Sequence, residues 1–186
     1  MTFIALLRGI NVGGKNTVRM ADLTSLLQSL HFTNIRSYLQ SGNFIFDHDR
    51  AGPSAVSRAI EQAISRKFGL DVKVIVRSAE KLRSLISGNP LLNRPKIDEE
   101  KLHVTFLKDA PQKPDISYFV RVKDARELVY LKGREVFLYC PNGYGRSKLT
   151  NQAFEKKLGV TATTRNWNTA CALAEMVKTV PTGHSV

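Results

Sequence analysis

The chain has 186 residues, 42% hydrophobic and 24% charged, which allows one domain or two small domains with a substantial hydrophobic core. Its two cysteines, Cys140 and Cys171, lie far apart and have no Cys or His neighbour at ligand spacing, which argues against a disulfide framework and against a zinc site. Lys and Arg exceed Asp and Glu by 28 to 16, a formal net charge of +12, so nucleic acids and phosphorylated small molecules are the first partners to consider.

The first half of the chain predicts a strand, a helix, two strands, a helix and a strand. The opening apolar run ends at Arg8, too early for a secretion signal or a membrane span, so we expect a soluble cytoplasmic protein with no membrane partner. Leu23, Leu27 and Leu30 repeat at helical spacing, and Gly69 stops the second helix. The expected strands are 2–9, 33–39, 43–47 and 72–77, and the expected helices are 20–31 and 52–68.

The second half predicts the same order of elements. A short helix capped by Ser78 and two Pro-containing breaks separate the halves. Strands are then expected at 103–107, 127–131, 135–139 and 160–163, and helices at 147–158 and 166–178, while 114–122 has an ambiguous pattern that fits a helix. The expected fold class is α+β, with two duplicated ferredoxin-like (α/β plait, βαββαβ) units that have antiparallel sheets. The units are residues 1–77 and 102–186, and residues 78–101 form a helix and linker.

Four short stretches concentrate Gly, Asn, Ser and basic residues: 8–16, 40–43, 141–148 and 163–169. In the expected topology the first two stretches share one sheet edge, the last two share another, and both edges border helix N-termini that favour anions. Turn chemistry alone explains the glycines and Ser147, which is an ordinary N-cap residue. It does not explain Lys15, Arg146, Lys148 and Arg165, because the helix dipole disfavours cations at helix starts.

We therefore predict that both edges face one inter-domain cleft that binds a phosphorylated or otherwise anionic small molecule. Ser147 is expected to cap its helix, and Arg146 and Arg165 are expected to point into a common concavity. The candidate ligand-binding residues are Arg8, Asn11, Lys15, Asn16, Gln40, Ser41, Asn43, Arg146, Ser147, Lys148, Arg165, Asn166 and Asn168.

Three alternatives stay open at this point. The even spread of charge over both halves is typical of a solvated surface, and it also fits a nucleic-acid-binding module with a broad basic face. The segment Gly9 to Lys15 approaches a nucleotide-binding P-loop, although Asn16 stands where Ser or Thr is needed. If the protein is an enzyme, Lys15 would stabilise charge and Ser147 would be the nucleophile, but no base to activate Ser147 is visible. No cofactor and no metal site are predicted.

The polar stretches also carry a resemblance that spans nearly the whole chain. Residues 7–16, 38–43, 139–149 and 164–169 are similar to motifs of the bacterial family catalogued as domain of unknown function 1697. One departure is Arg19-Met20, where family members typically read Pro-Met. The resemblance implies two ferredoxin-like units in a cytoplasmic protein, and it implies no activity.

Overall fold

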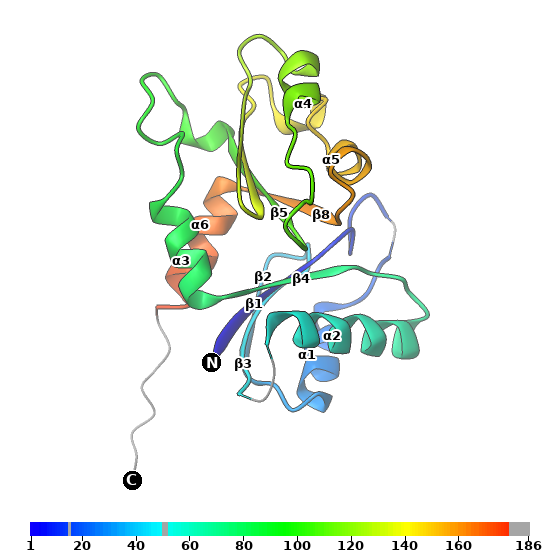
Figure 1. Cartoon of the computed structure of the whole chain (residues 1–186). Helices are drawn as coiled ribbons and strands as arrows, with labels where there is room; N and C mark the ends of the chain where they lie inside the picture. Colours follow the sequence, from blue (N-terminus) through cyan, green and yellow to red (C-terminus); the bar gives the residue numbers. More distant parts are fainter. Residues whose placement is uncertain (15, 50–51, 179–186) are drawn as a thin grey trace.

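A computed structural model describes residues 1–14, 16–49 and 52–178. Over these residues the protein is a mixed α/β structure with two four-stranded antiparallel sheets and six α-helices (Figure 1). The first sheet contains β1 (Thr2–Leu7), β2 (Thr33–Tyr38), β3 (Asn43–Asp47) and β4 (Val74–Ser78) in the order β2-β3-β1-β4. The second contains β5 (Leu102–Leu107), β6 (Leu128–Lys132), β7 (Glu135–Tyr139) and β8 (Ala162–Asn166) in the order β6-β7-β5-β8.

The helices follow the predicted order in both halves. They are α1 (Met20–Ser29), α2 (Pro53–Phe68), α3 (Ala79–Ser87), α4 (Ser117–Val122), α5 (Asn151–Leu158) and α6 (Trp167–Met176), with short 3-10 turns at Glu99–Lys101 and Tyr144–Arg146. Both halves therefore run strand, helix, strand, strand, helix, strand, and each is followed by one more helix.

Several predicted boundaries differ from the observed ones, and two of these differences concern the candidate site. Helix α5 begins at Asn151 because Tyr144–Arg146 forms a separate 3-10 turn and Thr150 is the N-cap, its hydroxyl accepting a hydrogen bond from the Ala153 N–H at 3.2 Å. Strand β8 continues to Asn166, which places Arg165 inside a sheet and not at a helix start.

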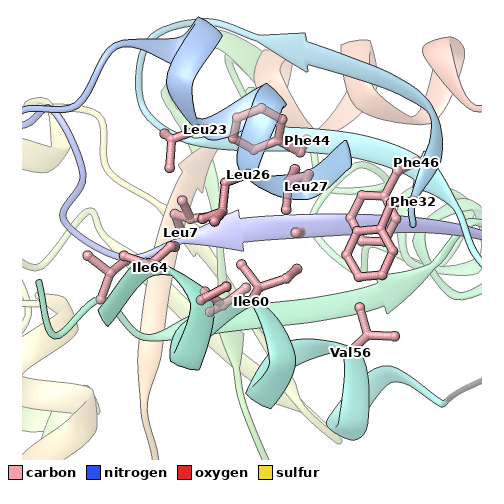
Figure 2. Packing of buried hydrophobic residues seen from close by; sticks show 14 of the residues in the cluster. Leu7, Leu23, Leu26, Leu27, Phe32, Phe44, Phe46, Val56, Ile60 and Ile64 are labelled. Atoms are coloured by element: carbon pink, nitrogen blue, oxygen red, sulfur yellow. The ribbon is translucent and has the colours of Figure 1, made fainter. Parts of the chain in front are cut away.

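Three apolar cores hold the structure together. Phe3, Ala5 and Leu7 of β1 point into the first core, beneath α1 and α2, and Figure 2 shows Phe32 stacked on Phe46 there, with ring centroids 4.4 Å apart. A separate core lies in the second half and includes Phe119 of α4 and Phe154 of α5. Because side chains alternate along a strand, the other face of β1 is available for a third core.

The third core is shared by the two halves. The first sheet contributes Ile4, Leu6, Ile45 and Ile75, the second sheet contributes Leu102, Val104, Phe106 and Phe137, and α3 and α6 add Leu82 and Trp167. The segment 78–101, for which the sequence predicts a helix and linker, is part of this core, because Leu85 and Leu91 belong to it. The halves are thus packed against each other through apolar surface.

The β2–β3 hairpin offers a test of packing near the end of β1. Gly42 has a φ of 73°, and a Cβ atom there would meet Ile10 Cγ2 and lie 2.8 Å from Leu7 Cβ. Left-handed backbone costs a residue with a side chain roughly 1–2 kcal/mol, and overpacking costs roughly 1–3 kcal/mol more. We expect Gly42→Ala to lower the free energy of unfolding by about 3 kcal/mol, measured by urea denaturation.

Gly133 in the β6–β7 hairpin is the matched control. Its φ is 62°, but an added Cβ atom would have no neighbour within 4 Å. Gly133→Ala should therefore cost about 1 kcal/mol, from backbone strain alone. Equal losses in the two variants would contradict the packing argument.

Candidate functional site

A cavity of about 520 Å³ lies where the end of β1 and the β2–β3 hairpin meet the second half, and it is called the large cavity because a second cavity lined by both halves has only about 220 Å³. Its lining consists of Leu7, Arg8, Gly9, Val12 and Ser41 from the first half and Tyr144, Thr150, Asn151, Gln152, Thr163, Thr164, Arg165, Asn166 and Thr169 from the second. All four polar stretches of the sequence contribute to this lining, together with the first turn of α5.

Arg165 forms the wall between the cavity and the protein interior. It lies on β8, the edge strand nearest α5 in Figure 1, and is only 9% exposed. Its guanidinium makes five hydrogen bonds, which is as many as it has N–H groups. The acceptors are Asn43 Oδ1 (2.6 Å), Thr163 Oγ1 (2.8 Å), and the carbonyls of Leu7 (2.9 Å), Thr164 (3.0 Å) and Ser41 (3.3 Å). Burial lowers the pKa of Arg165 to about 10.

Arg77 makes the corresponding contacts from the first half to the second half. It lies on β4 of the first half, and its Nη2 donates to the carbonyl of Leu107 at the end of β5 (2.5 Å) and to that of Arg134 in the β6–β7 hairpin (3.3 Å). Its Nε donates to Glu135 Oε1 at 3.0 Å, and both side chains are buried. Each half thus inserts one arginine from its last strand into the other half.

A second pair of matched contacts lies beside the arginines. Arg8, directly after β1, forms a two-pronged ion pair with Glu155 of α5 at 2.6 and 2.7 Å. Lys108, directly after β5, pairs with Glu61 of α2 at 2.6 Å. Both glutamates also accept a hydrogen bond from the first N–H of the strand that follows their helix.

Hydroxyl groups are gathered on the second-half side of the cavity. Thr164 Oγ1 lies 2.7 Å from Thr105 Oγ1, accepts from the Tyr144 hydroxyl at 3.0 Å and donates to Asn151 Oδ1 at 2.6 Å. Burial raises the pKa of Tyr144, so its hydroxyl stays protonated and neutral at physiological pH. The ring of His103 stacks on that of Tyr144 at a centroid distance of 5.0 Å.

Of the predicted site residues that the structure describes, four line the cavity: Arg8, Ser41, Arg165 and Asn166. Three others hold the adjoining loops in place. Asn11 binds the backbone of Val18 and donates to the Gln40 carbonyl at 3.0 Å, and Asn16 donates to the Gly9 carbonyl at 3.1 Å. Asn43 donates to the Tyr38 carbonyl at 2.8 Å and accepts from Arg165. The side chain of Gln40 is exposed.

The remaining candidates that the structure describes do not line the cavity. The Ser147 hydroxyl accepts from the Leu149 N–H at 3.0 Å, so the expectation that Ser147 caps α5 is wrong, because Thr150 occupies the cap. Arg146, Lys148 and Asn168 are exposed. The expected convergence of Arg146 with Arg165 is not observed, since Arg165 is buried and Arg146 is not. Lys15 lies outside the described residues.

Sequence reasoning missed Thr150, Asn151, Thr163 and Thr164 as site residues. Thr150 could have been found, because a Thr directly before a helical segment is a common N-cap. Thr163 and Thr164 belong to the polar stretch 163–169, of which only Arg165, Asn166 and Asn168 are predicted candidates. Nothing in the spacing of the two threonines predicts that Thr163 accepts from Arg165 or that Thr164 bonds to three other hydroxyl and amide groups.

The P-loop alternative does not fit this geometry. That fold needs a parallel sheet and a helix that begins at the lysine, whereas β1 is antiparallel to both β3 and β4 and α1 begins at Met20. Within the described residues, no group of three or more His, Cys, Asp or Glu side chains is placed to hold a metal ion. Over the same residues, the helices are too short or too polar to cross a membrane.

The fold and the cavity define a mixed α/β protein whose two halves repeat one strand order and enclose a polar cavity at their junction. The chain belongs to the family described as Protein of unknown function (DUF1697), whose profile matches residues 1–137. It is also similar to the structure of the conserved bacterial protein SP0830 from Streptococcus pneumoniae, with a TM-score of 0.74 and 21% identity, covering 95% of this chain and 98% of that one. This likeness shows the fold alone. A comparison with curated proteins gave no match.

Replacing Arg165 tests its role in joining the halves. Lysine has three donors in place of five, so Arg165→Lys leaves at least two buried acceptors without a partner. We expect the free energy of unfolding to fall by about 3 kcal/mol, measured by urea denaturation. Arg146→Lys changes an exposed arginine of the same half and should leave stability within about 0.5 kcal/mol. Similar losses in both variants would contradict the assigned role.

His103 should make the protein sensitive to mild acid. Burial lowers its pKa below the ordinary value of 6.5, so below about pH 6.5 the unfolded chain binds a proton that the folded chain does not. The stability that neutral His103 contributes is therefore fully present above about pH 6.5 and is lost as the pH falls below it. We expect His103→Phe, which keeps a ring against Tyr144, to flatten the fall in unfolding free energy between pH 6.5 and 5. His31→Asn, a change at an exposed histidine, should not flatten it.

Proposed function

We propose that the cavity at the junction of the two halves binds a small anionic molecule such as a phosphate ester. The observation that carries this proposal is the charge of the lining: among the described residues that line it, the charged side chains are Arg8 and Arg165, both positive. A volume of about 520 Å³ is within the range of small-molecule sites.

The neutral part of the lining supports a ligand that also makes directional hydrogen bonds. Hydroxyls of Ser41, Thr150 and Thr169 and the amides of Asn151 and Gln152 border the cavity. These groups can donate to or accept from the polar atoms of a phosphorylated metabolite. The first turn of α5 adds backbone N–H groups, which favour an anion.

We further propose that the two halves are a duplicated ferredoxin-like unit. The repeated strand order supports this, and so do the reciprocal contacts of Arg77 with Leu107 and of Arg165 with Leu7, which join equivalent positions of the two halves. A site at the junction would then lie between the end of the first strand of one half, β1, and the end of the last strand of the other half, β8.

Arg8→Ala tests the binding site, with Lys108→Ala as the matched control at the equivalent ion pair. The first change removes a cation from the cavity and frees the negative charge of Glu155 close to it, so we expect the thermal stabilisation by phosphate or a sugar phosphate to fall by more than half. Lys108→Ala breaks a similar ion pair and should leave that stabilisation intact.

Oligonucleotides distinguish the rival function. A broad basic surface that contacts several phosphates gives an affinity that falls steeply with salt, whereas one small anion gives a shallow dependence. We expect weak oligonucleotide binding and a shallow salt dependence for the small ligands. Tight, steeply salt-dependent oligonucleotide binding that Arg8→Ala leaves unchanged would favour the nucleic-acid-binding module.

A further inference from the structure

The two buried arginines differ in how their charge is balanced. Arg77 and Arg165 are each the fourth residue of a five-residue strand, and each binds the first residue of the other half's third strand. That residue is Glu135 for Arg77, which is a carboxylate, and Asn43 for Arg165, which is a neutral amide.

A second equivalent position shows the same difference. The second residue after β5 is Asp109. Burial lowers the pKa of Arg77, and the negative charges of Glu135 and Asp109 oppose that shift. The second residue after β1 is Gly9, which lines the large cavity. Among the described residues, no carboxylate forms an ion pair with Arg165, and burial is the only cause that shifts its pKa. The guanidinium of Arg165 is therefore satisfied in hydrogen bonds but not in charge.

A buried positive charge without a counter-charge attracts anions into the cavity beside it. Attraction between charges is stronger at a partly buried site than at an exposed one, because water screens exposed charges. All five N–H groups of Arg165 already have acceptors, so this residue acts on the cavity through its charge and not by donating a hydrogen bond to a ligand. The five hydrogen bonds also fix the position of the Arg165 guanidinium and therefore of its charge.

The region beside Arg77 is the natural comparison. A cavity of about 220 Å³ there is lined by Lys108, Arg134 and Asp109, with Arg58 at its exposed side. Lys108 is paired with Glu61, and the buried Arg77 is paired with Glu135. Within the part of the chain that the structure describes, the cations of this lining without an ion pair are Arg58, which is exposed, and Arg134, which is half-buried, so water and salt screen them. The volume of this cavity is less than half that of the large cavity.

We propose that Asn43 and Gly9 determine the charge selectivity of the large cavity: a neutral residue at each position leaves the charge of Arg165 to be balanced by a bound anion. This inference rests on the proposed function and names the positions that set it. The ligand supplies the negative charge that Glu135 and Asp109 supply on the other side. Phosphate monoesters and other compact dianions fit this requirement better than neutral sugars or nucleosides.

The test supplies the missing charge from the protein and measures the dissociation constant of inorganic phosphate by NMR titration of the full-length chain. Asn43→Asp places a carboxylate on Arg165, and Gly9→Asp places one in the cavity wall. Gly9→Asn is the neutral control, since Asn and Asp both tolerate the φ of 70° and an added Cβ atom at Gly9 has no neighbour within 4 Å. Glu135→Gln is the control on the other side.

We expect Asn43→Asp and Gly9→Asp each to weaken phosphate binding about tenfold or more, and Gly9→Asn to change it by less than about twofold. Glu135→Gln should leave phosphate binding at the large cavity unchanged. If Asn43→Asp does not fold because it loses the bond to the Tyr38 carbonyl, the two Gly9 variants decide.

Wild-type affinity in both Asp variants, or an equal loss in Gly9→Asn, would overturn the inference while leaving the proposed function in place. A loss in Glu135→Gln as large as that in Asn43→Asp would also overturn it, because the effect would then not depend on the cavity. Failure of the proposed function is a separate result, in which the wild-type protein shows no shift with phosphate at the cavity residues.

Discussion

The arrangement of the molecule depends on two arginines, one from each half, and each is buried against the other half. The end of a first strand has backbone carbonyls that the sheet does not satisfy, and burying such groups without a partner is costly. Arg165 binds the carbonyl of Leu7, and Arg77 binds that of Leu107. Each guanidinium also reaches the adjacent hairpin, so one side chain fixes two elements of the opposite half.

The apolar core between the sheets complements these polar contacts. Hydrophobic burial is not directional, and by itself it would allow the two sheets to slide over each other. The guanidinium contacts are directional, so they set the register between the halves. The position of the large cavity follows from that register, because its lining combines the loop after β1 with β8 and the first turn of α5.

Local patterns in the sequence predicted most of the fold. Helical spacing, hairpin residues and Gly stops act over a few residues, and the predicted elements agree in order with those observed. The candidate site was predicted less well. The sequence places Arg165 beside a helix, but its partners Leu7 and Asn43 lie 158 and 122 residues away, and only the tertiary structure brings them together. In the sequence Arg146 and Lys148 are basic residues of polar stretches, as Arg165 is. In the structure Arg165 is buried, whereas Arg146 and Lys148 are exposed.

The shared core has a consequence for synthesis on the ribosome. The first half is made before β5 exists, and domains generally fold from the N-terminus as they emerge. Residues 1–78 can form their own sheet and the core beneath α1 and α2, but Ile4, Leu6 and Ile45 then face water and Arg77 lacks both Leu107 and Glu135. The nascent first half therefore carries an apolar sheet face with a cation at its edge until the second half is translated. A chaperone that shields apolar surface would be needed most during that interval.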